Sequence, residues 1–244
     1  MTTTCTVKLD KLELMIDGIK YSWAKGLKQV LNLIPSKQLV DMIYESIVNT
    51  IVTGQECGFK IARINDLVTP IESTFTLSGD KGSVSLPFME SLGSFHTHVY
   101  LNMICSPNDV LYSMACGEDL FIIGYPNYVL HVYVFNKEGV YEAYRKLLGI
   151  SRYLRRKKSE DRELLAMAHG LEYKFYSLIE LMLHVSSGLR ELFKHIYVVT
   201  PSGMVFDVLS RLEDNVRVFN EIDFRNRFEK IKHEVELLEK LAYR

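Results

Sequence analysis

The chain has 244 residues, of which 48% are hydrophobic and 24% are charged, and its formal net charge is −1. This composition is typical of a globular protein and lacks the strong positive charge that indicates a nucleic-acid partner. The N-terminus has no basic segment followed by an apolar core, and the most apolar run, residues 121–135, is too short to cross a bilayer. Four cysteines without zinc-ribbon or redox spacing indicate reduced thiols. We therefore expect a cytoplasmic, intracellular protein with no membrane partner.

Residues 1–35 are expected to form an N-terminal hairpin and a short helix. Apolar residues alternate with polar ones from Val7 to Ile16, and Asp17 and Gly18 are typical turn residues. A short helix is then predicted over residues 23–33. This hairpin would lie at the edge of the main sheet.

Residues 36–140 are predicted to form an α/β domain. Ser36 begins a helix in which apolar residues recur at helical spacing from Leu39 to Ile51, and Gly54 ends it. Four strands are expected over residues 57–64, 67–77, 82–86 and 92–98, with at most a turn or two between 87 and 92. A helix over residues 106–116 and a hairpin over residues 120–125 and 128–135 follow.

Residues 141–244 are predicted to be mainly helical. Apolar residues from Leu164 to Leu192 recur at steps of four and three, which predicts one long helix with a narrow apolar seam. A second run from Phe224 to Ala242 has the same spacing. Between the two runs, residues 196–200 and 204–209 predict two strand-like arms. We favour packing of the two seams on each other or on the preceding domain, and an intermolecular coiled coil that gives a homodimer is the alternative.

A basic cluster lies at the start of this helical region, at Arg152, Arg155, Arg156, Lys157 and Lys158. Acidic residues follow at once, which is typical of a solvated helix face. Nucleic-acid binding would require aromatic or groove-reading residues nearby, and the cluster offers only a tyrosine. An acidic protein partner for the cluster stays open.

The segment from Gly93 to Asp109 carries the most specific pattern. His96 and His98 are followed after seven residues by Ser106 and after two more by Asp109. On a strand, His96 and His98 point to the same side, and Ser106 is a typical helix N-cap that places Asp109 in the first helical turn. Each pair alone has a simpler explanation, because His-x-His is common in strands and Ser-x-x-Asp is a common cap. Together they offer three ligands with one open position, the pattern of a catalytic zinc site.

This combination resembles the motif of the JAMM (MPN+) zinc metallopeptidases at all four positions. That family also uses a glutamate after the first helix of the domain, and Glu56 is the matching residue. The resemblance covers roughly residues 36–137 and implies an MPN (JAMM, cytidine-deaminase-like) mixed sheet flanked by helices, here with a helical C-terminal extension. In that family a proline often follows the second histidine, and Val99 takes its place here. Phe95 replaces a frequent tryptophan or tyrosine, so the subfamily stays open.

The resemblance implies that His96, His98 and Asp109 hold Zn²⁺. Glu56 would be the general base that activates a water and passes its proton to the leaving amine, and the Ser106 hydroxyl would stabilise the oxyanion.

If Glu56 is not the general base, the next candidates are Glu72 and Glu45. Glu72 is the stronger of the two because it lies on a predicted strand.

JAMM enzymes cleave the amide or isopeptide bond at the C-terminus of ubiquitin or a ubiquitin-like modifier, so such a protein or a peptide is the expected substrate. Two alternatives stay open. One is a non-catalytic interaction subunit that docks a partner through the helical C-terminal region. The other is a hydrolase of a different amide or small molecule.

Overall fold

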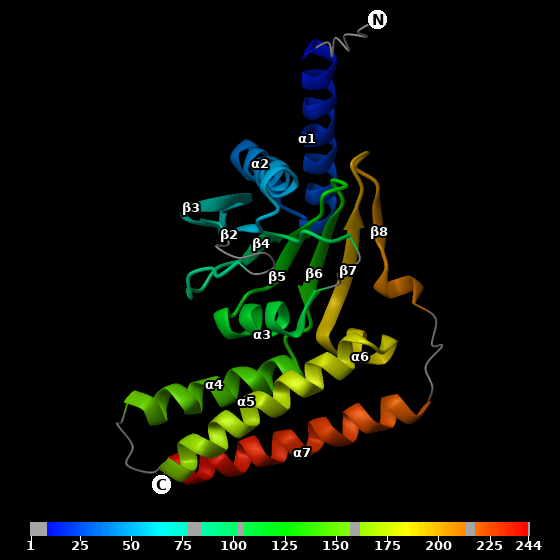
Figure 1. The fold of residues 1–244 in the computed structure, drawn as a ribbon. Coiled ribbons are helices and arrows are strands. Elements are labelled where there is room, and N and C mark those ends of the chain that lie inside the picture. The colour runs from blue at the N-terminus through cyan, green and yellow to red at the C-terminus, as the bar shows by residue number, and fades with distance from the viewer. Residues whose placement is uncertain (1–8, 78–83, 102–104, 157–161, 213–217, 244) are drawn as a thin grey trace, which may run out of the picture.

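The computed structural model describes residues 9–77, 84–101, 105–156, 162–212 and 218–243 (Figure 1). The helices are α1 (Leu9–Leu31), α2 (Lys37–Thr53), α3 (Pro107–Cys116), α4 (Val140–Arg156), α5 (Arg162–Leu183), α6 (Ser186–Leu192) and α7 (Val218–Ala242), with a 3₁₀ turn at Leu209–Arg211. The strands are β1 (Ile34–Pro35), β2 (Cys57–Ile64), β3 (Leu67–Leu77), β4 (Gly93–Thr97), β5 (Leu120–Gly124), β6 (Leu130–Phe135), β7 (Phe193–Val199) and β8 (Val205–Asp207).

The strands form one mixed sheet of eight in the order β1-β3-β2-β4-β5-β6-β7-β8. β1 pairs with β3 and β4 pairs with β5 in parallel, and the other neighbours are antiparallel. The predicted mixed α/β architecture is therefore present. The predicted hairpin over residues 120–135 is confirmed as β5 and β6.

The two faces of the sheet are buried by different sets of helices (Figure 1). Successive residues of a strand point to opposite faces. Ile122 of β5 packs in a cluster with side chains of α1 and α2, whereas Phe121 and Ile123 pack with side chains of α3 to α7. Each face thus has its own apolar core.

The predicted N-terminal hairpin is wrong, because α1 is a single helix that begins at Leu9. Trp23 and Leu27 are fully buried four residues apart, and Ile19 packs against the same cluster. Burial of this stripe favours the helix over the alternating pattern, and Gly18 is tolerated inside it. The predicted short helix over residues 23–33 is the second half of α1.

The predicted helix after Ser36 is confirmed as α2. The Ser36 hydroxyl accepts the Leu39 N–H at 3.0 Å, and Gly54 ends the helix in the left-handed conformation with φ 69°. The strands over residues 57–64 and 67–77 are also confirmed.

The predicted strand over residues 82–86 is wrong where the structure describes it. Residues 84–92 carry no helix or strand, and residues 82–83 lie outside the described part. The Tyr112 hydroxyl of α3 is 2.7 Å from the Leu86 carbonyl and 2.8 Å from the Pro87 carbonyl. The Tyr112 side chain therefore forms the hydrogen bonds to this backbone that a neighbouring strand would otherwise form.

The single long helix predicted from Leu164 to Leu192 is wrong as well. α5 ends at Leu183, Val185 is extended, and α6 begins at Ser186. Gly188 packs so closely on the backbone of Met182 that a Cβ would lie 2.5 Å from its carbonyl oxygen, so the chain folds back on itself.

Two further predictions for the C-terminal region hold. The strand-like arms form β7 and β8, and β7 pairs with β6, so this region extends the sheet. The apolar seams of α5 and α7 pack in one cluster with α4, as favoured. The homodimer stays a prediction. Among the described residues, no helix combines the length and apolar character needed to cross a membrane.

Candidate metal centre

Strand β4 lies between β2 and β5, carries His96 and ends one residue before His98. His96 is in β4, and the N–H of His98, just beyond its end, donates to the Gly124 carbonyl at 3.0 Å. The two Nε2 atoms are 3.1 Å apart. Thr97 points to the opposite side, where its hydroxyl lies 2.6 Å from that of Thr50. The predicted alternation thus directs both imidazoles to one point.

Helix α3 brings Asp109 to the same point. The Ser106 hydroxyl accepts the Asp109 N–H at 3.2 Å, and the Asp109 carboxylate accepts the Ser106 N–H at 2.7 Å, which is a complete capping box. Asp109 Oδ1 lies 3.4 Å from His96 Nε2, and Oδ2 lies 3.6 Å from His98 Nε2. The cap therefore fixes the carboxylate beside both rings.

The spacing of these atoms fits a metal ion. Ligand atoms ~2.0–2.1 Å from a tetrahedral zinc ion lie ~3.3 Å apart, close to the observed 3.1, 3.4 and 3.6 Å. A hydrogen bond between the rings would occupy one Nε2 as donor, whereas a cation would satisfy both. Among the described residues, this is the one cluster of three such side chains placed to hold a metal.

The protonation of the cluster also suits a cation. Burial lowers the pKa of His96 to about 4, so the ring is neutral near pH 7, the form that ligates metals. Burial alone would raise the pKa of Asp109, but His96, His98 and the Ser106 N–H hold it well below its usual range. His98 Nδ1 is buried and has no hydrogen-bond partner within the described chain, so no acceptor there fixes its tautomer.

Glu56 lies between the end of α2 and the start of β2. The residue is 5% exposed. Burial raises the pKa of its carboxyl, Asp109 raises it further, and His98 and the Val99 N–H oppose the shift. Glu56 shares a cleft of about 420 Å³ with the three candidate ligands and Ser106. A carboxyl with a raised pKa beside a metal site is suited to proton transfer near neutral pH.

The two alternative candidates for the general base lie outside the cleft. Glu45 of α2 and Glu72 of β3 line a separate depression with Lys37 and Asp41, and neither lines the cleft.

The structure adds cleft residues that the sequence did not reveal. Ser94 lies two residues before His96 on the same face of β4, and Tyr112 lies one helical turn after Asp109. Both spacings are visible in the sequence and could have been used. Val84, Ser85, Leu86, Asn108 and Ser113 complete the lining.

A buried ion pair lies behind this lining. Lys60 of β2 and Glu118 are both fully buried, and Lys60 Nζ is 2.5 Å from Glu118 Oε1. Glu118 also accepts the Ser94 hydroxyl at 2.8 Å and the Ser91 hydroxyl at 3.2 Å. Lys60 Nζ lies 4.4 Å from the centre of the Tyr112 ring. The pair thus connects β4, α3 and the segment before β4.

Part of the basic cluster also supports α3. Arg145 and Arg152 of α4 donate to the Ala115 carbonyl at 2.9 and 3.4 Å, and the Arg152 guanidinium lies 4.7 Å from the centre of the Phe88 ring. Arg152 is exposed, as predicted for a solvated helix face, and its guanidinium also contacts α3 and Phe88. Arg155 and Arg156 are exposed, and the two lysines lie outside the described residues.

Comparison of the chain with protein-family models, with curated proteins and with solved structures found no match. The fold and site thus define a mixed α/β protein with a cleft in which two histidines and an aspartate could hold a metal ion.

Proposed function

We propose that this chain is a zinc-dependent metallopeptidase or isopeptidase of the JAMM (MPN+) type. Its reaction would be cleavage of an amide or isopeptide bond at the C-terminus of a ubiquitin-like modifier. The observation that carries the proposal is the convergence of His96, His98, Asp109 and Glu56 in one cleft, at the sequence spacing of that motif.

The ligand set is one that catalytic zinc sites use. Two imidazoles and one carboxylate with an open position hold zinc in hydrolases and also hold non-haem Fe(II), so the choice of zinc rests on the resemblance to the JAMM motif. Zinc bound there would supply a Lewis acid for the scissile carbonyl and lower the pKa of an attacking water.

Glu56 would move the proton in this reaction. The water oxygen forms a bond to the carbonyl carbon while its proton passes to the Glu56 carboxylate. The C–N bond then breaks, and the same proton goes to the leaving amine. The raised pKa of Glu56 supports both transfers.

Ser106 would stabilise the oxyanion. Its oxygen accepts the Asp109 N–H, which leaves the hydroxyl proton free to donate into the cleft. Loss of one such donor costs about 3 kcal/mol of barrier in other acyl-transfer enzymes. Capping and catalysis are therefore compatible roles for this side chain.

The proposal includes the finer fold assignment. Residues 36–140 would be an MPN-type domain, followed by a helical extension. The support is that α2 leads into Glu56, β4 carries His96 and leads directly into His98, and α3 carries Asp109.

The first test is metal content by mass spectrometry on protein purified without chelators or metal-affinity steps. We expect about one zinc per chain, lost in His98→Ala and kept in His233→Ala, an exposed histidine of α7 that serves as the matched control. Cleavage of modifier-conjugated substrates by the zinc-loaded protein then tests the activity. Absence of zinc from the unaltered chain would contradict the proposal, and zinc without cleavage would favour the interaction-subunit alternative.

A further inference from the structure

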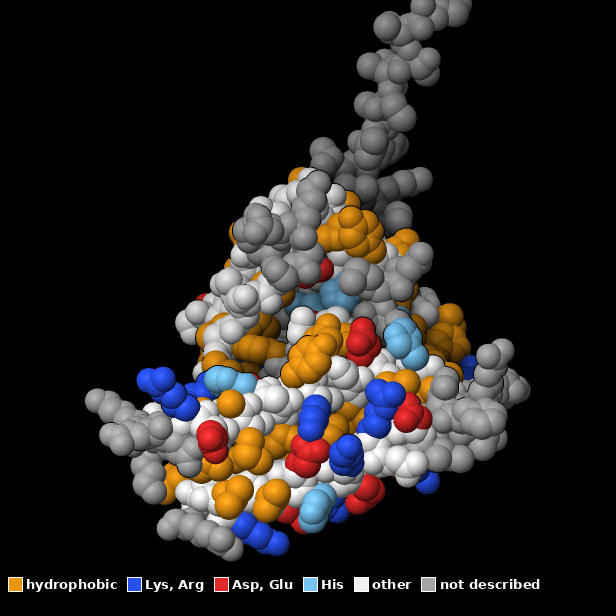
Figure 2. All heavy atoms as spheres, turned by 60° about the horizontal axis from the view of Figure 1, so that its bottom comes forward, with side chains coloured by type: hydrophobic (Ala, Val, Ile, Leu, Met, Phe, Trp, Pro, Cys, Tyr) orange, Lys and Arg blue, Asp and Glu red, His pale blue; other side chains and the backbone are white. Residues whose placement is uncertain are grey.

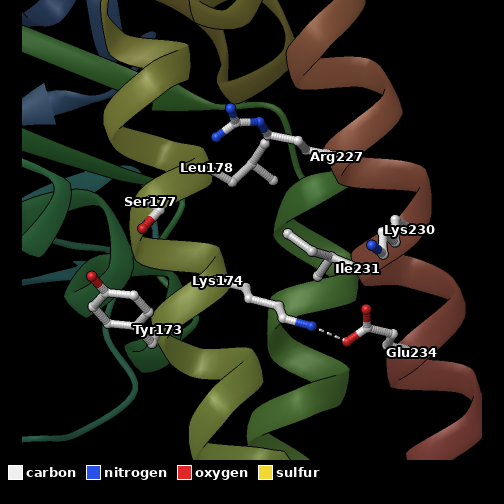
Figure 3. Close-up of a pocket in the computed structure, with 8 residues that line it drawn as sticks. All are labelled: Tyr173, Lys174, Ser177, Leu178, Arg227, Lys230, Ile231 and Glu234. Atoms are coloured by element: carbon white, nitrogen blue, oxygen red, sulfur yellow. Dashed lines mark hydrogen bonds and ion pairs between the residues drawn. The ribbon is translucent and has the colours of Figure 1, made fainter.

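A small groove lies between α5 and α7, away from the metal cleft (Figure 3). Leu178 of α5 and Ile231 of α7 form its apolar floor and are 1% and 5% exposed. Lys174 and Glu234 reach across it from opposite helices (Figure 3). The groove and the cleft share no lining residue.

The size of the groove indicates what it can hold. Its volume is about 180 Å³, below the ~300–1,000 Å³ of typical small-molecule pockets. One aliphatic side chain fits such a space, as in grooves that bind an amphipathic helix. Apolar side chains form bands along the helical layer, between basic and acidic ones (Figure 2).

The rim of the groove is mainly basic. Lys174, Arg227 and Lys230 line it with a single carboxylate, Glu234. Lys174 pairs with Glu234, and Arg227 pairs with Asp223 at 2.8 Å. Lys230 is exposed and has no carboxylate partner among the side chains that the structure describes. An incoming carboxylate would complete this arrangement.

An aromatic residue stands beside the basic rim. Tyr173 is 73% exposed and lines the groove from α5. Tyrosine and arginine are enriched at protein interfaces, where they contribute much of the binding energy. The apolar floor and Glu234 do not suit a phosphate backbone, which is bound mainly through positive charge.

We propose that this groove docks an acidic helical segment of a partner protein. One aliphatic side chain of the segment would lie between Leu178 and Ile231, and its carboxylates would face Lys230 and Arg227. The inference is independent of the metal site, because it uses none of the cleft residues.

The test uses fluorescein-labelled 14-residue helical peptides and the full-length chain in a fluorescence anisotropy titration. The first peptide places one leucine among glutamates, the second replaces that leucine with asparagine, and the third replaces the glutamates with lysines. We expect binding of the first peptide only, with backbone amide NMR shifts concentrated at Tyr173, Leu178 and Ile231.

Two exposed lysines of α7 provide a matched pair of variants. Lys230→Glu should weaken binding of the first peptide by about tenfold or more, whereas Lys232→Glu, with the same charge change outside the groove, should weaken it by less than about threefold. Zinc content should be the same in the two variants, so a failure of peptide binding can be distinguished from a failure of the proposed activity.

Several results would overturn the inference. These are absence of peptide binding, equal binding of the leucine and asparagine peptides, or equal loss in the two variants. If a 20-base-pair DNA duplex binds at the groove in preference to the first peptide, the partner is nucleic acid and not an acidic helix. If the free chain forms a dimer and Lys230→Glu dissociates that dimer, the partner is a second copy of this chain.

Discussion

One lysine–glutamate pair lies behind the lining of the metal cleft and another lies in the α5–α7 groove, and the two pairs differ in their surroundings. Lys60 and Glu118 are 0% exposed, and the carboxylate accepts two further hydroxyl groups. The side chains of Lys174 and Glu234 are 48% and 27% exposed. The same chemical pair is therefore a fixed part of the structure behind the cleft, whereas in the groove water can replace either partner.

The largest expected effect lies at the candidate base. Glu56→Gln should reduce the hydrolysis rate by about 10³-fold, because an amide cannot accept the proton of the attacking water. Zinc content should not change, since Glu56 is not one of the three ligands. Single-turnover kinetics on the zinc-loaded variant measure this. Full activity in Glu56→Gln would show that another group is the base.

The second effect is the contribution of the buried Lys60–Glu118 pair to stability. Lys60→Met should lower the free energy of unfolding by about 3–5 kcal/mol, because it leaves the buried Glu118 carboxylate without its cation. Urea denaturation measures this difference. Adding Glu118→Gln should recover part of the loss, since the amide still accepts the Ser94 hydroxyl. A loss below about 1 kcal/mol in the single variant would mean that water reaches the pair.

The third effect is a dependence of stability on pH in the metal-free chain. Burial lowers the pKa of His96 to about 4, against ~6.5 in the unfolded chain. Between these values the unfolded chain binds more protons, so stability is present above pH 6.5 and is lost as the pH falls. At pH 5 the loss from His96 should be about 2 kcal/mol relative to pH 7.

One other group acts in the same pH window. Burial also lowers the pKa of His131 to about 4, whereas the depressed pKa of Asp109 affects stability only below pH ~4. Denaturation of chelator-treated protein at pH 7 and pH 5 measures the sum. The difference should shrink in His96→Asn, and equal differences in the variant and the unaltered chain would assign the effect to other groups.

The smallest effect belongs to the groove pair. Lys174→Met should change the free energy of unfolding by less than about 1 kcal/mol, because both partners are solvated. The same urea experiment used for Lys60→Met makes the comparison direct. A loss as large as that of Lys60→Met would mean that the groove pair also has a structural role.

The sequence predicted the parts of the site that depend on local backbone geometry. Ser106, Asp109 and Gly117 mark the two ends of α3, and the alternation of β4 places His96 and His98 together. These features depend on neighbours a few residues away, which a sequence pattern contains.

The failures depend on distant partners. Asp17 and Gly18 are typical turn residues, but the helix is favoured because Trp23 and Leu27 pack against α2 and the sheet. Lys60 stands between apolar residues of β2, and its partner Glu118 lies 58 residues away in the sequence. The break between α5 and α6 is hidden because the apolar spacing continues across it.

The pairing of β7 with β6 has a practical consequence for work on the isolated N-terminal half. A fragment that ends near residue 140 would expose the whole hydrogen-bonding edge of β6, together with the apolar face that α4, α5 and α7 bury. Unpaired edges of this kind promote aggregation. Fragments for expression or crystallisation should therefore retain residues 193–199, even where only the cleft is of interest.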